Sequence, residues 1–70
     1  MPKMTVRQKR EVMLQIIQLL ASSPYPLTTN EIAEKIERSW AFTNELLETL
    51  KKMRKTVKLS KGKSVYWHIF

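Results

Sequence analysis

The first part of the chain repeats its apolar positions every three to four residues, the spacing that is typical of an α-helix. Thr5 and Gln8 form the sequence pattern of a capping box, which predicts that a first helix begins here and runs to about residue 21. Pro24 prevents its continuation, because proline lacks a backbone N–H and restricts the residue before it.

This first helix is apolar over an arc of roughly 200°, whereas a helix that docks on one side needs about 100° or more. Two interpretations stay open. The helix is the central core helix of a small bundle, or it also joins two copies of the chain. We expect the second, a homodimer. The expected interface residues are Val12, Ile16 and Leu19.

Two further amphipathic segments follow. Thr28 and Glu31 form a second capping box, which predicts a helix over about 29–37. Ser39 is a suitable N-cap for a third helix over about 40–54. Apolar residues and one threonine recur on the inward face of this third helix at spacings of three and four. They are Thr43, Leu46, Leu47, Leu50 and Met53.

The last stretch changes to alternating positions rich in β-branched and aromatic residues, which predicts a β-hairpin over about 56–69. Gly62, the only glycine, is expected to supply the positive φ of its turn. Trp67 is expected to pack in the core against the first helix, and residues 27–28 to pair as a short strand. The prediction is one mostly helical α+β domain over residues 1–70, with three helices and a C-terminal hairpin.

The segments LTTNEIAEKIERSWAFTNELLETLKKM and VKLSKGKSVYWHI together resemble a winged helix-turn-helix domain. Small Ala33 fits where two helices cross closely, and residues 39–43 are similar to the opening of the recognition helix in many archaeal winged-helix regulators. The resemblance implies an archaeal or viral regulator. It also implies that the third helix enters a DNA major groove and that the hairpin, or wing, contacts the DNA backbone or minor groove.

The sequence departs from the family pattern in three places. Arg38 stands where the turn usually has an apolar residue, and Arg54 lies in the stretch before the wing where glycine is usual. The expected reading face of the third helix carries Glu45 and Glu48 instead of Arg or Lys. Two carboxylates on this face weaken non-specific attraction to phosphate, unless flanking cations outweigh them.

Charge is distributed unevenly along the chain, which has 13 Lys and Arg residues, 6 acidic residues and a formal net charge of +7. Residues 1–26 are net basic, residues 27–50 are net acidic, and residues 51–70 hold seven cations and no acid. This order favours nucleic acid as the partner, with phosphate contacts from the two flanks and a weakly charged reading helix.

The sequence lacks the residues that several other classes of function require. The chain has no cysteine and one histidine, which excludes disulfides, thiolate metal sites and His-cluster metal sites. No glycine-rich phosphate loop is present. We therefore expect no enzyme activity, no metal and no cofactor. The longest uncharged run is interrupted by two glutamines and no signal sequence is evident, so we expect a cytoplasmic protein without a membrane span.

The expected DNA contacts follow from side-chain chemistry. Lys61 and Lys63 suit phosphate, Asn44 suits adenine, and Glu45 or Glu48 suits the cytosine amino group. Cations near the N-terminus are expected to add backbone contacts, namely Lys3, Arg7, Lys9 and Arg10. The complete expected DNA-binding set is Arg38, Ser39, Trp40, Asn44, Glu45, Glu48, Lys51, Lys52, Lys55, Lys61 and Lys63.

The sequence thus predicts a small, dimeric transcriptional regulator that binds double-stranded DNA sequence-specifically. Two alternatives stay open. The first is a winged-helix module that binds a protein through its acidic second and third helices. The second is a general DNA-coating or architectural protein that reads the backbone with little sequence preference. For Trp40 two roles stay open as well, shielding the turn or projecting towards DNA.

Overall fold

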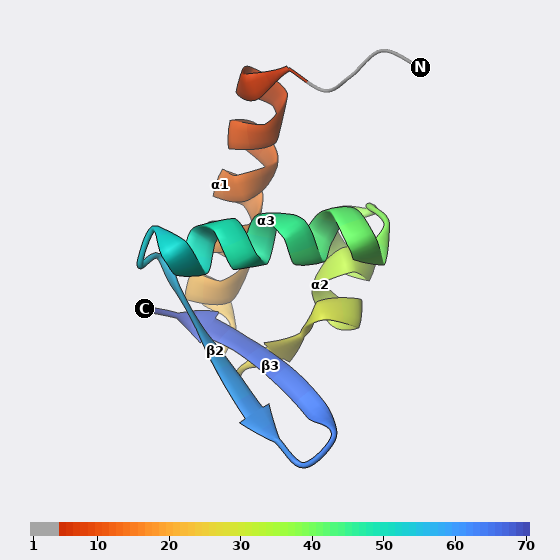
Figure 1. The fold of residues 1–70 in the computed structure, drawn as a ribbon. Helices are drawn as coiled ribbons and strands as arrows, with labels where there is room; N and C mark the ends of the chain where they lie inside the picture. The colour runs from red at the N-terminus through yellow and green to blue at the C-terminus, as the bar shows by residue number, and fades with distance from the viewer. Residues whose placement is uncertain (1–4) are drawn as a thin grey trace.

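The computed structural model describes residues 5–70, and Figure 1 shows three helices packed on a small sheet. The elements are α1 (Val6–Ser22), β1 (Leu27–Thr28), α2 (Thr29–Ile36), α3 (Trp40–Lys52), β2 (Thr56–Lys61) and β3 (Ser64–Ile69). Each element expected from the sequence is present, and the helix bounds lie within about two residues of the expected ones, the uncertainty of such assignments.

Side-chain caps begin all three helices. Thr5 Oγ1 accepts from the Gln8 N–H at 3.1 Å, and Gln8 Oε1 accepts from the Thr5 N–H at 2.9 Å. Thr28 and Glu31 form the same reciprocal pair at the start of α2. Ser39 Oγ accepts from a backbone N–H in the first turn of α3 at 3.2 Å. Because each cap satisfies an N–H group without a helical partner, the three predicted helix starts are confirmed.

Two helices end on a left-handed residue that is not glycine. Glu37 after α2 has φ 56°, and Arg54 after α3 has φ 60°. In both cases the N–H of the next residue donates to the carbonyl five residues back, at 3.0 Å after α2 and 2.9 Å after α3. This is the pattern of a Schellman motif. The end of α3 therefore has the conformation of a helix that ends on glycine, because Arg54 adopts the left-handed conformation that glycine favours.

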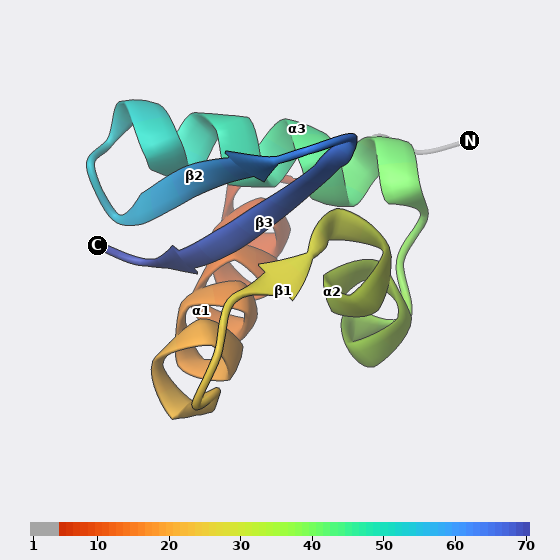
Figure 2. The same cartoon turned by 90° about the horizontal axis from the view of Figure 1, so that it is seen from below.

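The sheet has the order β1-β3-β2 and is antiparallel throughout (Figure 2). Strands β2 and β3 form the hairpin, in which Lys61 pairs with Ser64 across a two-residue turn. Gly62 opens this turn with φ 63°, as the sequence predicts. Leu27 of β1 pairs with Trp67 of β3, so the short strand joins the hairpin to the start of α2.

The core lies between the three helices and the sheet. Trp67 is fully buried, and its indole N–H donates to Thr29 Oγ1 at 2.8 Å, which ties β3 to the first turn of α2. The buried apolar cluster consists of Val12, Ile16, Leu20, Leu27, Ile32, Leu46, Leu47, Leu50 and Trp67. The predicted core position of Trp67 is confirmed.

Two residues expected at a dimer interface lie inside this core. Val12 is 3% exposed and Ile16 is 0% exposed. They pack against the chain's own elements, so a second copy cannot reach them while the domain is folded, and this part of the prediction is wrong. Leu19 is partly buried against the same core.

Met53 is a second correction. The sequence places it on the inward face of α3, but it is 53% exposed. The reason is the end of the helix, since α3 stops at Lys52 and the left-handed Arg54 turns the chain towards β2. The helical projection therefore no longer applies at Met53.

Candidate nucleic-acid interface

The hairpin begins just after the C-terminal end of α3 and diverges from the helix, so that its turn points away from α3 (Figure 1). Seen from below, the turn lies under the N-terminal part of α3, and Trp40 lines one cleft together with residues of the turn (Figure 2). We call the combined surface of α3 and the hairpin the α3–wing surface. It is defined by polar and aromatic side chains of both elements, most of them exposed: Trp40, Asn44, Glu48, Lys51, Lys58, Lys61 and Lys63. The wing tip is the part of the sheet that lies farthest from α3 (Figure 1).

Glu48 lies in the middle of this surface between two lysines. Its Oε2 accepts from Lys58 Nζ of β2 at 2.9 Å, and its Oε1 lies 3.2 Å from Lys51 Nζ. The hydrogen bond from Lys58 holds the pKa of Glu48 below its ordinary value, with a further contribution from Lys51. The carboxylate is therefore compensated by two cations. One of these cations, Lys51, comes from α3 itself, and the other, Lys58, comes from the hairpin.

Glu45 lies on the other side of α3, towards α1. Its Oε1 is 4.0 Å from Lys9 Nζ, and both side chains are largely exposed. This pair is loose and contributes little to stability, as is usual for exposed ion pairs. The position of this pair shows that cations flank α3 on both sides, Lys9 of α1 on one side and the lysines of the hairpin on the other.

Trp40 lines a shallow cleft beside the wing tip. The side chain is 55% exposed. The cleft has a volume of about 350 Å³ and is bounded by the start of α2, the start of α3 and the tip: Thr28, Thr29, Asn30, Trp40, Lys63, Ser64 and Val65. Of the two roles open for Trp40, this exposure favours contact with a ligand over shielding of the turn.

Two exposed lysines lie at the wing tip. Lys61 and Lys63 flank Gly62, and all three residues are exposed. A single positive φ, at the first turn residue, is the pattern of a type II′ hairpin turn. The narrow turn therefore holds two ammonium groups away from the body of the domain.

The remaining predicted contact residues are divided between different surfaces. Arg38 and Ser39 are exposed in the turn between α2 and α3, and Ser39 Oγ already accepts the capping hydrogen bond. Lys52 is exposed on α3. Lys55 instead lines a groove against α1, away from the wing. Lys3 lies outside the described residues.

Two residues were not among the predicted DNA contacts, one on the α3–wing surface and one in the cleft beside it. Lys58 pairs in register with Trp67, and its ammonium lies 5.6 Å from the centroid of that indole ring. The alternation along the hairpin placed both on one face, which was the available signal. Asn30 was missed because only tertiary packing brings the start of α2 to the wing tip.

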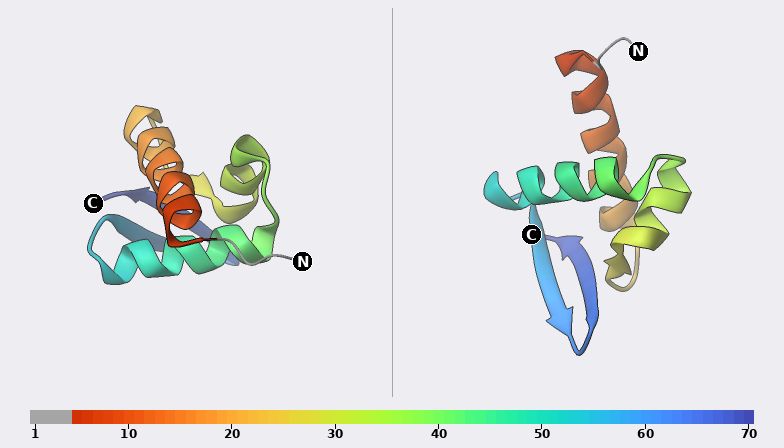
Figure 3. Two further views of the ribbon diagram at one scale, coloured as in Figure 1. Left: turned by 90° about the horizontal axis from the view of Figure 1, so that it is seen from above. Right: turned by 45° about the vertical axis from the view of Figure 1, so that its right-hand side comes forward.

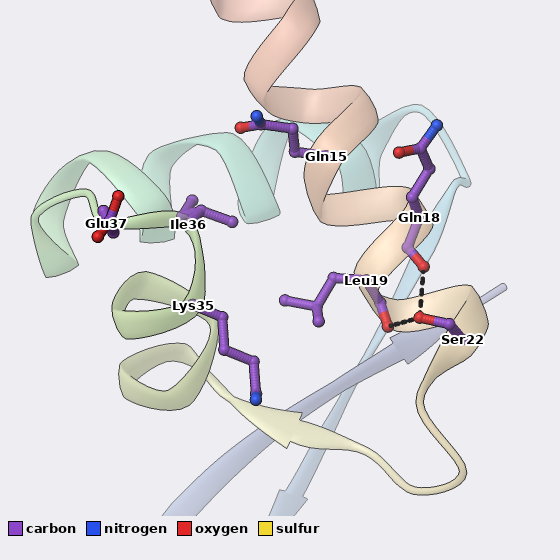
Figure 4. Close-up of a pocket in the computed structure, with 7 residues that line it drawn as sticks. All are labelled: Gln15, Gln18, Leu19, Ser22, Lys35, Ile36 and Glu37. Atoms are coloured by element: carbon purple, nitrogen blue, oxygen red, sulfur yellow. Dashed lines mark hydrogen bonds between the residues drawn. The ribbon is translucent and has the colours of Figure 1, made fainter.

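A second groove separates α1 from α2 and has a volume of about 400 Å³. Figure 4 shows Leu19 and Ile36 pointing into it, with two glutamines of α1 above and Lys35 below. Ser22 Oγ donates to backbone oxygens of its own helix and is not available to a ligand as a donor. The lining combines side-chain amides with one Lys and one Glu, which is no catalytic constellation.

Metal-binding clusters and membrane spans were sought in residues 5–70. Within this range no three His or Glu side chains come together as metal ligands. None of the described helices has the length and apolarity to cross a bilayer.

No protein-family model matches the sequence, and no curated protein is significantly similar to it. Solved structures are similar in fold. The Zalpha domain of Carassius auratus PKZ, solved in complex with Z-DNA, superposes with a TM-score of 0.79 at 18% identity, over 89% of this chain and 97% of that one. The fold is a winged helix. Its three helices and three-stranded antiparallel sheet confirm the fold class predicted from the sequence.

Two longer proteins contain a similar winged helix. Wild-type ZitR of Lactococcus lactis in complex with DNA matches with a TM-score of 0.66 at 25% identity, over 99% of this chain and 44% of ZitR. Human N-acetylserotonin methyltransferase in complex with SAM matches with a TM-score of 0.78 at 21% identity, over 89% of this chain. The chain spans only 18% of that enzyme and less than half of ZitR.

Proposed function

We propose that this chain binds double-stranded DNA sequence-specifically and acts as a small transcriptional regulator. The single observation that carries the proposal is the compensation of Glu48 by Lys51 and Lys58, at 3.2 and 2.9 Å. The two acids were the main argument against a DNA-reading α3. With Glu48 paired on one side and Glu45 near Lys9 on the other, the α3–wing surface carries a cationic excess.

The proposed binding mode assigns a task to each part of this surface. Helix α3 lies in the major groove, where Asn44 hydrogen-bonds an adenine edge. Lys61 and Lys63 at the wing tip contact phosphate or the minor groove. Trp40 packs on sugar and phosphate beside the tip. The flanks supply affinity and the weakly charged helix supplies discrimination between sequences.

Two structural neighbours support the proposal, since the Zalpha domain and ZitR were both solved with DNA. The methyltransferase shows that a similar fold also occurs within an enzyme of different function, so the fold alone decides nothing. The electrostatics of the α3–wing surface therefore carry more weight here than the neighbours. We propose binding without catalysis, with regulation through occupancy of the DNA site.

Selection of bound duplexes from a random DNA pool at physiological salt tests the proposal directly. A coherent sequence motif supports sequence-specific reading. Bound duplexes without a common motif indicate the architectural alternative. Failure to retain any duplex contradicts DNA binding and leaves the protein-interaction module, with its acidic α2, as the better reading.

Replacing both wing-tip lysines is the sharpest variant. We expect Lys61→Ala with Lys63→Ala to lower DNA affinity about tenfold near 0.1 M salt and to reduce the slope of log K against log salt by about two. Fluorescence anisotropy across a salt series measures both. Lys35→Ala, in the groove between α1 and α2, removes one charge outside the α3–wing surface and should leave the slope unchanged. Equal effects of wing and α2 variants would contradict the assigned role of the wing.

A further inference from the structure

The outer face of α1 forms an exposed, largely apolar groove. It has a volume of about 560 Å³ and ends against the C-terminal part of α3. Val6 is 73% exposed, Leu14 52% and Met53 53%. The groove is lined by Val6, Met13, Leu14, Ile17, Leu50 and Met53, with Lys9, Arg10 and Lys55 also contributing. Exposed apolar surface concentrated in this way is typical of an interaction site.

The shape of the molecule leaves this face uncovered. In Figure 1 the N-terminal half of α1 rises beyond α3, and the right-hand view of Figure 3 shows it extending past the other elements. The described chain is correspondingly elongated, with principal extents of 37 × 20 × 20 Å. Intramolecular packing thus covers the Val12 and Ile16 side of the helix and leaves the Leu14 side in solvent.

The charges of α1 are arranged unfavourably for a helix on its own. Its first turn holds no acid and its last turn holds no base. Arg7, Lys9 and Arg10 stand near the N-terminal end, where the helix dipole disfavours cations, while residues 12–22 carry no charge at all. These cations would gain from the C-terminal end of another helix.

We propose that a second copy of this chain occupies the groove, with the two α1 helices packed antiparallel about a two-fold axis between Met13 and Leu14. This arrangement goes beyond the proposed function, because it adds association of two copies through α1. Antiparallel pairing sets Met13 opposite the partner's Leu14, Arg10 opposite the partner's Ile17, and Val6 opposite the partner's Ala21. The small Ala21 leaves room for Val6, and the aliphatic stem of Arg10 covers Ile17.

Antiparallel pairing also gives the N-terminal cations of α1 a favourable environment. Each cluster of N-terminal cations faces the uncharged half and the C-terminal carbonyls of the partner helix. Parallel pairing would instead set Arg7 against Arg7 and Arg10 against Arg10. None of the groove residues belongs to the hairpin, so this dimer leaves both wings free.

Single-cysteine variants test the arrangement without background, because the chain contains no cysteine. We expect Leu14→Cys to form a disulfide-linked dimer under mild oxidation, since the two residues lie next to the axis. Val6→Cys alone should not crosslink, because an antiparallel pair separates these positions by about 22 Å along the helices. A mixture of Val6→Cys and Ala21→Cys should crosslink.

Leu59→Cys on the wing is the matched control, since Leu59 is 42% exposed but lies outside the groove. It should crosslink much less than Leu14→Cys. Self-crosslinking of Val6→Cys as efficient as that of Leu14→Cys would overturn the antiparallel arrangement. Non-reducing gel electrophoresis of the oxidised samples gives the readout.

Sedimentation of the unmodified chain provides the independent measurement. We expect the mass to rise from 8.3 kDa towards twice that value between one and several hundred micromolar. Leu14→Arg should shift the transition at least tenfold upward in concentration with an unchanged circular dichroism spectrum. A wild-type mass of 8.3 kDa throughout overturns the dimer. Because no DNA is present, this result is separate from failure of DNA binding.

Discussion

Seven cations and no acid follow Leu50, whereas not one charge stands between Val12 and Ser22. The first segment includes the hairpin of the α3–wing surface, and the second includes Met13, Leu14 and Ile17 of the α1 groove. Both surfaces are exposed, but one is cationic and the other is apolar. A domain this small has too little interior to bury all its apolar side chains.

Each surface would be stabilised by a different kind of partner. Clustered ammonium groups repel one another, and a polyanion relieves this repulsion while releasing its counterions. Exposed Val6, Leu14 and Met53 keep apolar area in water, and a second apolar surface removes it. The two surfaces therefore call for chemically different partners, which can bind at the same time.

The two sides of α1 give the largest expected contrast. Ile16→Ala should lower the free energy of unfolding by about 2–5 kcal/mol, because Ile16 is fully buried and its truncation leaves a cavity. Leu14→Ala, on the exposed side of the same helix, should change it by less than about 1 kcal/mol. Urea unfolding at low micromolar protein concentration measures both, with little contribution from dimer.

Equal destabilisation by these two variants would contradict the division of α1 into a core side and a partner side. The dependence of the unfolding midpoint on protein concentration provides a second test. The unfolding midpoint of the unmodified chain should rise with protein concentration, and that of Leu14→Ala should rise less, since association stabilises the folded state by mass action.

Glu48→Gln probes the α3–wing surface with a smaller effect. Removing the carboxylate frees Lys51 and Lys58, so affinity for non-specific DNA should increase a few-fold and its salt slope should increase by up to about one. The free energy of unfolding should change by less than about 1 kcal/mol, because the pairs are partly exposed. Glu34→Gln on α2 is the control and should not alter DNA binding.

The same variant should change the pH dependence of stability. The folded chain lowers the pKa of Glu48, chiefly through Lys58, so this group stabilises the fold above its unfolded pKa and loses that effect as pH falls through the folded value. Glu48→Gln should therefore flatten the acid limb of the stability curve. Unfolding midpoints between about pH 5 and pH 2.5 measure this; an unchanged acid limb would argue against the Lys58 pair.

Arg54→Gly, between the two surfaces, has the smallest expected effect. Arg54 holds φ 60° without glycine's freedom, so we expect the substitution to stabilise the domain by about 0.5 kcal/mol, a rise of roughly 3 °C in Tm. Arg54→Ala keeps the strained conformation and should give no such gain. A gain of equal size from alanine would point to relief of charge repulsion instead of backbone strain.

Much of the fold was predictable because its signals are local. The caps at Thr5, Thr28 and Ser39 depend on side chains three residues from the N–H groups they satisfy. The hairpin depends on alternation and on Gly62. Even the two-residue strand β1 was expected, although its partner, β3, lies almost forty residues further along the chain.

The sequence alone determined where helices and strands begin, which face of each is apolar, and that positive charge gathers at the two ends of the chain. Tertiary packing selected the apolar face of α1 that enters the core, so that Val12 and Ile16 are buried while Leu14 stays exposed. It also decided that Lys58, ten residues from Glu48, neutralises it. The periodicity of a sequence determines on which side of a helix each side chain lies. Which of several apolar or charged residues become its contact partners depends on how separate elements pack in space.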